Sequence, residues 1–270
     1  MTRRINGVSE VIGRVDAVCV DQYGVLHDGK TALPGARDCL ERIRAAGLPV
    51  LALTNSGKRA DENAARLERL GFPRHLFTGL LSSGEVVWHM LRSRLECGDL
   101  APGARVCLLS RDNDRSLVSG LDLTLVAPGS DADLVLIAGI EPERHSRDAY
   151  RALLSTHAKR GVPAIAANPD HVMYTSSGAA FGPGAVADDY RSAGGHVHVI
   201  GKPSPDFFAA ALDRFDGISP GRVLMVGDSP VHDIAGAKQA GLKTLLIEGG
   251  VQSGLGTTGT ADYVLEALRW

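Results

Sequence analysis

Three segments of the chain repeat one arrangement, in which a helical pattern ends at glycine and a short apolar run follows. The segments are RIRAAGLPVLALTN, HAKRGVPAIAANPD and AKQAGLKTLLIEGG. Glycine suits the left-handed conformation that often ends a helix. Continuous apolar runs of about five residues are typical of strands whose two faces are both covered by helices in a parallel sheet. The chain is therefore predicted to be an α/β protein.

Further apolar runs extend this pattern, and helix-length patterns separate them. They lie at 15–20, 105–109, 134–138, 197–200 and 222–226. Alternation on this scale predicts βαβ units. The chain has 270 residues, of which 44% are hydrophobic, which is enough for one large core or for a core with a sizeable insertion. Because no low-complexity linker divides it, a second domain is expected to be an insertion.

The composition does not favour some classes of partner. Lys and Arg (29) nearly balance Asp and Glu (31), so the total charge does not favour a nucleic acid or an anionic membrane. No stretch approaches the ~18 apolar residues of a membrane span, and a cytoplasmic location is expected. The four cysteines lack C-x-x-C spacing and are expected to be reduced thiols rather than disulfides or a metal site.

Polar side chains gather directly after four predicted strands. They are Asp21; Thr54, Asn55 and Ser56; Lys202; and Asp228 with Asp233. Ligands of open parallel sheets bind beyond the carboxyl ends of the strands. Converging carboxylates repel one another unless a cation lies among them, and oxygen-only ligands suit Mg²⁺. A cation-bridged phosphate held by Thr54 and Lys202, in line with Asp21, would complete a phosphoryl-transfer site.

The order and wording of four motifs resemble those of the haloacid dehalogenase (HAD) superfamily. The motifs are DQYGVL, LTNSG, GKPSP and GDSPVHD. The resemblance spans nearly the whole chain and implies a Rossmann-like parallel-sheet core with an inserted α/β cap domain. The stretch between LTNSG and GKPSP, with IAANPD and FGPGAVADDYRSAGG, is similar to the cap of the class IIA branch, which includes phosphatases of nucleotides, pyridoxal phosphate and sugar phosphates. The core is accordingly expected at 1–82 and 198–270, and the cap at 83–197.

The resemblance implies a Mg²⁺-dependent phosphohydrolase that acts on a small phosphorylated metabolite through an aspartyl-phosphate. By motif, Asp21 would be the nucleophile and a metal ligand, and Lys202 would neutralise Asp21 and the phosphate. The phosphoryl oxygens would be bound by Thr54, with Asn55 and Ser56 beside it. Mg²⁺ would be held by Asp228 and Asp233, although Asp233 could instead support another ligand. Caps of this type can mediate dimers, so a homodimer is one expected assembly.

Tyr23 departs from the phosphatase pattern, because it stands where those enzymes carry a general acid–base aspartate. The backbone carbonyl of that residue is also a metal ligand in the family, and this role survives any side chain. The Tyr23 ring could pack under the turn or place its phenol at the site mouth. His27 and Asp170 are candidate replacement acids, and Asp170 could also face the substrate. A missing general acid typically costs ~10²–10⁴ in rate.

Two other functions are compatible with Tyr23. The haloacid dehalogenases carry D-x-Y-G-T-L as their nucleophile motif, but their reaction needs no metal, and they lack the first acid of the last motif, which is Asp228 here. A regulatory protein that binds phosphate and turns over little is the other alternative. The run GLGTTG at 254–259 matches G-x-G-x-x-G, yet no helical pattern opens there, so no dinucleotide site is predicted.

Overall fold

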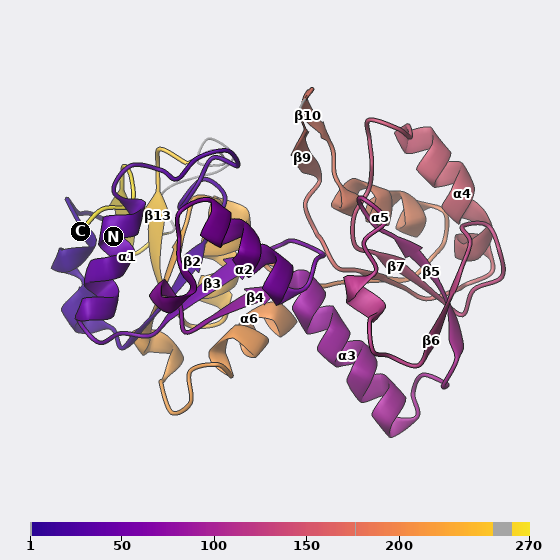
Figure 1. Ribbon diagram of the computed structural model, residues 1–270, viewed down its shortest axis with the longest axis horizontal. Helices are drawn as coiled ribbons and strands as arrows, with labels where there is room; N and C mark the ends of the chain where they lie inside the picture. The colour runs from indigo at the N-terminus through magenta and orange to yellow at the C-terminus, as the bar shows by residue number, and fades with distance from the viewer. Residues whose placement is uncertain (1, 176, 251–260) are drawn as a thin grey trace. The chain divides into compact units, whose positions relative to one another are not determined.

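The computed structural model describes residues 2–175, 177–250 and 261–270, and the GLGTTG run lies outside them. The chain forms two compact units (Figure 1). The first comprises Met1–Thr54, Asp61–Leu81 and Lys202–Trp270, and the second comprises Asn55–Ala60 and Ser82–Gly201. The range expected for the cap, 83–197, lies within the second unit, which also contains the segment 55–60.

A seven-stranded sheet forms the centre of the first unit. Its strand order is β1 (Arg3–Arg4), β14 (Tyr263–Leu265), β13 (Lys243–Ile247), β12 (Val223–Gly227), β2 (Ala17–Asp21), β3 (Val50–Thr54) and β4 (Gly79–Ser82). The pairings from β1 through to β3 are parallel. Every residue of β2 and β12 is buried, as their continuous apolar sequences predict. The predicted parallel-sheet α/β fold is confirmed.

Helices and short turns complete the first unit. The helices are α1 (Ala36–Ala45), α2 (Ala60–Arg69), α6 (Pro205–Leu212) and α7 (Gly236–Gln239), with 3₁₀ turns at Val8–Glu10, Ile12–Arg14, Arg74–Leu76 and Pro220–Arg222 and a π-helical turn at Pro230–Ala235. One face of α1 carries Leu40 and Ile43, which share a buried cluster with Val18 and Val20 of β2. Alternate residues of the strand thus face the same helix-covered core.

The second unit has its own parallel sheet and its own core. The strand order is β11 (Val197–Val199), β8 (Ala164–Ala166), β7 (Leu134–Ile137), β5 (Ala104–Leu109) and β6 (Leu123–Val126). The helices are α3 (Ser83–Cys97), α4 (Arg147–Lys159) and α5 (Pro183–Ser192), with a 3₁₀ turn at Ser116–Val118 and an antiparallel hairpin of β9 (Val172–Thr175) and β10 (Gly178–Phe181). Among the described helices of both units, none combines the length and apolar character of a membrane span.

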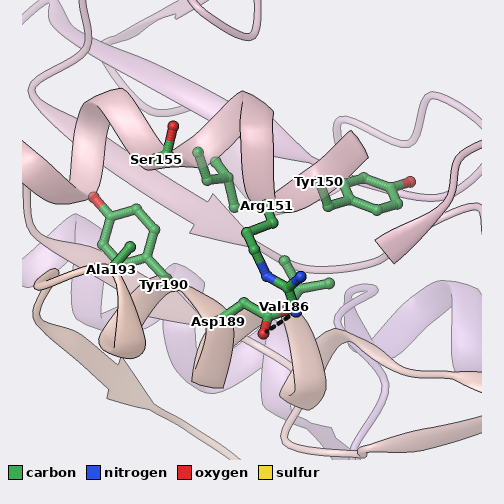
Figure 2. A pocket seen from close by; sticks show the side chains of 8 residues that line it. Tyr150, Arg151, Ser155, Val186, Asp189, Tyr190 and Ala193 are labelled. Carbon is green, nitrogen blue, oxygen red and sulfur yellow. Dashed lines mark hydrogen bonds and ion pairs between the residues drawn. The ribbon is translucent and has the colours of Figure 1, made fainter. Parts of the chain in front are cut away.

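A small pocket lies between α4 and α5 of the second unit (Figure 2). The Tyr190 hydroxyl, at one side of this pocket, donates to the Val162 carbonyl at 2.7 Å. Asp189 pairs with Arg147 at 2.7 Å and with Arg151 at 3.0 Å. Because each of these polar groups has a hydrogen-bond or ion-pair partner, we interpret the pocket as part of the packing between α4 and α5.

Candidate active site

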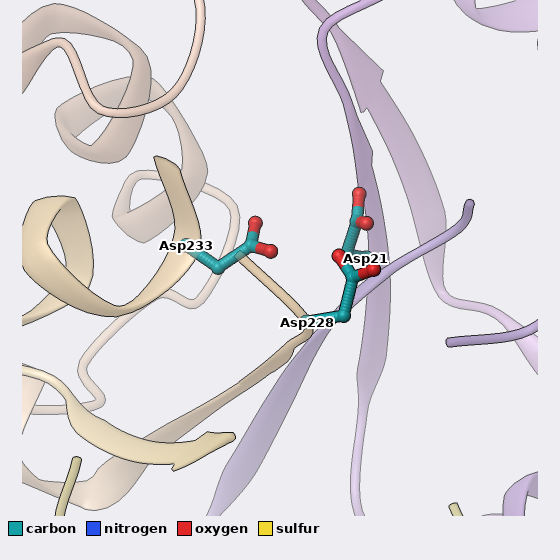
Figure 3. A group of neighbouring side chains, drawn as sticks. All are labelled: Asp21, Asp228 and Asp233. Atoms are coloured by element: carbon teal, nitrogen blue, oxygen red, sulfur yellow. The ribbon is translucent and has the colours of Figure 1, made fainter. Parts of the chain in front are cut away.

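Three buried carboxylates come together in the first unit (Figure 3). Asp21 is the last residue of β2, Asp228 follows β12, and Asp233 lies in the π-helical turn Pro230–Ala235. One ligand oxygen from each lies within 4.8 Å of the others. The strand ends meet because β2 and β12 pair in parallel, with Val20 opposite Val226. The structure thus brings together the three acids that the sequence predicts as metal ligands.

Two glycines make the close approach of these acids possible. An added Cβ at Gly227 would collide with the side chain of Asp233, and one at Gly250 would collide with the side chain of Asp228. The Asp233 carboxylate is also fixed from its own turn, because Ser229 N donates to its Oδ2 at 3.0 Å. The geometry of the cluster is therefore set by backbone as well as by side chains.

Lys202 lies within the same cluster and is 3% exposed. Its Nζ donates to Asp233 Oδ1 at 2.7 Å and also to Asp21 Oδ1. Burial lowers the pKa of the Lys202 ammonium, but the carboxylates of Asp21 and Asp233 raise it by more, so this pKa lies above its ordinary value. Lys202 is therefore a permanent cation at neutral pH.

The charges at this site are unbalanced without a further cation. Burial raises the pKa of the Asp21 carboxyl, the Lys202 ammonium opposes this rise, and the charges of Asp233 and Asp228 add to it. The cluster thus holds three buried carboxyl groups and one ammonium, that of Lys202, which contacts Asp21 and Asp233. A divalent cation among the carboxylate oxygens would offset the remaining charge, and an all-oxygen donor set fits a hard ion such as Mg²⁺.

The side chain of Tyr23 packs against the turn that follows it. Its ring meets the His27 ring edge-on, with 6.0 Å between centroids and an interplanar angle of 73°. Gly29, at a φ of 95°, lies against the Tyr23 ring, because an added Cβ there would be 3.2 Å from Tyr23 Cε2. These contacts agree with a packed ring, and the catalytic role of Tyr23 stays a prediction.

His27 is buried beside this ring and is 2% exposed. Its Nδ1 accepts the Gly29 N–H at 3.0 Å. Burial lowers the pKa of His27 to about 4, and the charge of Arg66 acts in the same direction. A neutral imidazole at pH 7 cannot serve as a cationic proton donor, which weakens the prediction that His27 replaces the missing acid.

The residues after β3 divide between the two units. Thr54 ends β3 in the first unit, in a register that places Leu53 opposite Asp21. Asn55 and Ser56 belong to the second unit. There Asn55 Nδ2 donates to Asp170 Oδ1 at 2.8 Å, which joins two residues that the sequence predicts as substrate-binding.

Sequence reasoning missed Glu85, which holds the segment 55–60 in the second unit. Its carboxylate accepts from Arg59 Nε and Nη2, at 2.6 and 2.9 Å, and from Ala60 N at 3.0 Å. Ser82 caps α3 by accepting the Glu85 N–H at 3.0 Å. The spacing S-x-x-E before an apolar run, SSGEVVW here, is the signal that could have identified Glu85 as a residue of a helix start.

Comparisons with known proteins agree with this geometry. A family profile described as haloacid dehalogenase-like hydrolase matches residues 15–241. Chronophin from Rattus norvegicus is 32% identical over 257 residues, which cover 93% of this chain and 82% of that protein. A crystal structure of a hydrolase of the haloacid dehalogenase-like family from Brucella suis has a TM-score of 0.86 at 28% identity and covers 98% of this chain and 99% of that chain.

A further crystal structure bears on the metal. It is that of glycerol phosphate phosphatase from Mycobacterium tuberculosis in complex with magnesium, which is 29% identical to this chain. The TM-score is 0.72, and the match covers 90% of this chain and 70% of that chain.

Proposed function

Because this chain belongs to the haloacid dehalogenase-like hydrolase family, we propose that it is a Mg²⁺-dependent phosphatase of a small phosphorylated metabolite. The observation that carries the proposal is the buried cluster of Asp21, Asp228 and Asp233 around Lys202. Retention of both later acids supports phosphate chemistry, because a carboxylate that displaces halide has no need of a metal. The magnesium complex of the related glycerol phosphate phosphatase supports the choice of ion.

Asp21 is the proposed nucleophile. One of its carboxylate oxygens would attack phosphorus, and the bond to the leaving-group oxygen would break with its electron pair on that oxygen. Water would then hydrolyse the aspartyl-phosphate, which releases inorganic phosphate and regenerates Asp21. Lys202 donates to one oxygen of Asp21, and its ammonium opposes the rise in the pKa of the Asp21 carboxyl that burial causes. Mg²⁺, held by Asp21, Asp228, Asp233 and the Tyr23 carbonyl, would supply positive charge that offsets the phosphate.

The remaining predicted site residues complete the proposal. Thr54 would bind the phosphoryl oxygens at the end of β3, together with Asn55 and Ser56. The unit that contains 83–197 would act as the cap and would provide specificity and exclude water. With Tyr23 in place of the usual aspartate, the enzyme would hydrolyse fastest those phosphate esters whose leaving groups need little protonation.

The variant Asp21→Asn tests the nucleophile. We expect it to lower kcat on p-nitrophenyl phosphate by ~10⁴ or more, since an amide cannot form the acyl phosphate yet fills the same volume. Phosphate release is measured with Mg²⁺ and with chelator, and circular dichroism and thermal unfolding check the fold. Near-normal turnover by a folded Asp21→Asn protein, or by wild type in chelator, would refute the proposed reaction.

A further inference from the structure

Both peptide groups of Tyr23 are hydrogen-bonded to a single later residue of the first unit, His27. His27 N donates to the Gln22 carbonyl at 3.1 Å, and Gly24 N donates to the His27 carbonyl at 2.8 Å. The two residues thus pair as in a parallel β-bridge. In a planar trans peptide the C=O and the N–H point in opposite directions. The Tyr23 carbonyl, which shares a peptide with Gly24 N, therefore points away from the His27 carbonyl.

The imidazole of His27 restrains this arrangement from the other side. Its Nδ1 accepts the Gly29 N–H at 3.0 Å, which closes the main chain between the two residues into a compact turn. The same turn lies against the Tyr23 ring, because an added Cβ at Gly29 would be 3.2 Å from Tyr23 Cε2. The hydrogen bond to Nδ1 therefore limits the freedom of the His27 carbonyl, to which Gly24 N donates.

Packing alone does not account for a histidine at this position. Because Nδ1 accepts a hydrogen bond, the hydrogen of the neutral ring is on Nε2. His27 Nε2 is buried and has no hydrogen-bond partner within the residues that the structure describes. An unpaired buried N–H destabilises a fold, and a phenylalanine would fill the place without one. The feature that distinguishes the histidine is the acceptor at Nδ1.

We propose that His27 is a positioning residue for the Mg²⁺ site, which holds the peptide after Tyr23 so that the carbonyl of Tyr23 keeps the direction a ligand needs. The inference rests on the proposed function, in which this carbonyl binds Mg²⁺ together with Asp21, Asp228 and Asp233. A ligand that outer partners already hold in place loses less freedom when the metal binds. In this role His27 transfers no proton.

The variants His27→Phe and His27→Asn separate this role from packing. Phenylalanine keeps a ring of similar size but cannot accept the Gly29 N–H, whereas an asparagine oxygen can. We expect His27→Phe to raise the Kd for Mg²⁺ by ~10–100-fold, the range for outer partners of metal ligands, and His27→Asn to stay within about threefold of wild type. Calorimetric titration with MgCl₂ alone measures both. Unchanged affinity in a folded His27→Phe protein, or equal losses in the two variants, would overturn the proposal.

The matched control, Thr244→Val, removes a similar hydrogen bond elsewhere in the first unit. Thr244 is buried, and its Oγ1 accepts the Asp262 N–H at 3.0 Å. Valine deletes this acceptor at similar volume, so the unfolding temperature should fall while the Kd for Mg²⁺ stays within about twofold of wild type. His27→Phe should show the opposite pattern, with weaker Mg²⁺ binding at an unfolding temperature near that of wild type. Equal losses of Mg²⁺ affinity in the two proteins would show a general loosening of the fold and would overturn the positioning role.

The rate on p-nitrophenyl phosphate, measured over a range of Mg²⁺ concentrations, keeps this test distinct from the test of the proposed function. The activity that His27→Phe loses at low Mg²⁺ should return at saturating Mg²⁺, because the nucleophile is unchanged. A loss that persists at saturation would contradict a role confined to the metal site. A wild type that binds Mg²⁺ without turnover would refute the phosphatase proposal alone, and the affinities of the variants would then decide the role of His27. A wild type that binds no Mg²⁺ would refute both.

Discussion

Asp21 must be ionised to act as a nucleophile, yet it lies in a buried site beside two other acids. Burial and these neighbours raise its pKa, and the Lys202 ammonium opposes them. Lys202 donates both to Asp21, the proposed nucleophile, and to Asp233. Since metal ligands must be deprotonated, binding of Mg²⁺ and ionisation of Asp21 are expected to favour one another.

Tyr23 is predicted to limit which leaving groups the site can expel. We expect wild type to hydrolyse p-nitrophenyl phosphate faster than an alkyl phosphate by ~10²–10⁴, the usual contribution of general acid catalysis. Tyr23→Asp should then raise the alkyl phosphate rate. The measurement is kcat/KM on both substrates, with unfolding by urea as a check, because loss of the packed ring costs stability.

Tyr23→Phe is the matched control, since it keeps the ring against Gly29 and removes the hydroxyl. It should leave both rates unchanged. If Tyr23→Phe alone lost the alkyl phosphate rate, the phenol itself would be the acid. High wild-type activity on alkyl phosphates, with no gain in Tyr23→Asp, would show that another group supplies the proton.

His27 makes the stability of the fold depend on pH. Its folded pKa of about 4 lies below the ordinary value of 6.5, so the unfolded chain takes up the proton first as the pH falls. The stabilisation is complete above pH 6.5 and is lost as the pH falls towards 4. Between pH 7.5 and 5 this amounts to about 2 kcal/mol of unfolding free energy.

His27→Asn tests this linkage, because an asparagine oxygen can take the place of Nδ1 as acceptor of the Gly29 N–H. Urea unfolding of wild type and variant at the two pH values gives the comparison. Between pH 7.5 and 5, the unfolding free energy of the variant should fall by about 2 kcal/mol less than that of wild type. Equal losses in both proteins would show that His27 titrates normally.

The local sequence pattern was sufficient to predict those helices and strands whose structure depends on residues nearby in the chain. The glycines that end the three predicted helices are Gly47, Gly161 and Gly241, and their φ values are 84°, 71° and 81°. The apolar runs at 15–20 and 222–226 overlap the buried strands β2 (Ala17–Asp21) and β12 (Val223–Gly227), each of which ends one residue later than its run. Parallel pairing then brings their ends together, so the approach of Asp21 and Asp228 could be predicted from strand ends, whereas Asp233 lies in the π-helical turn that follows β12.

Other elements could not be predicted because distant contacts determine them. The edge strand β6 (Leu123–Val126) is only partly buried and has no continuous buried face. The segment 55–60 follows a strand of the first unit, yet contacts with Glu85, Gly84 and Ala138 assign it to the second. Such contacts depend on residues about 25 to 80 positions away, which periodicity cannot detect.

The contribution of Glu85 to the start of α3 can be tested by substitution. Burial raises the pKa of its carboxyl, but Arg59 and the Ala60 N–H hold this pKa below its ordinary value. Glu85→Gln removes the charge and one acceptor from a side chain that is 11% exposed. We expect it to lower the unfolding free energy by about 1–3 kcal/mol in urea.

Glu96→Gln on the same helix is the control. Glu96 pairs with Arg92 at 2.8 Å, but its side chain is 63% exposed. Glu96→Gln should therefore change the unfolding free energy by no more than about 0.5 kcal/mol. Equal effects of the two substitutions would mean that the Arg59–Glu85 pair does not stabilise the start of α3.

At the scale of the whole molecule, two carboxylate-nucleophile reactions have to be distinguished. Both would begin with attack by Asp21, and Tyr23 stands where the nucleophile motif of the haloacid dehalogenases also has a tyrosine. They differ in the charge that the site must accommodate. A phosphate monoester brings further negative charge to Asp21, Asp228 and Asp233, and a cation is needed to offset it. Displacement of halide from carbon brings no phosphate, so it requires neither the metal nor the later acids.

One preparation of wild type, divided between Mg²⁺ and chelator, distinguishes these reactions. We expect phosphate release from p-nitrophenyl phosphate with Mg²⁺, a fall to background in chelator, and recovery when Mg²⁺ is restored. Halide release from 2-chloropropionate should be at background in both halves. The unfolding temperature should also rise with Mg²⁺, because an ion that binds the folded state stabilises it by about RT ln(1 + [Mg²⁺]/Kd). Halide release in chelator, with no phosphate release under either condition, would instead assign the cluster of acids to a dehalogenase.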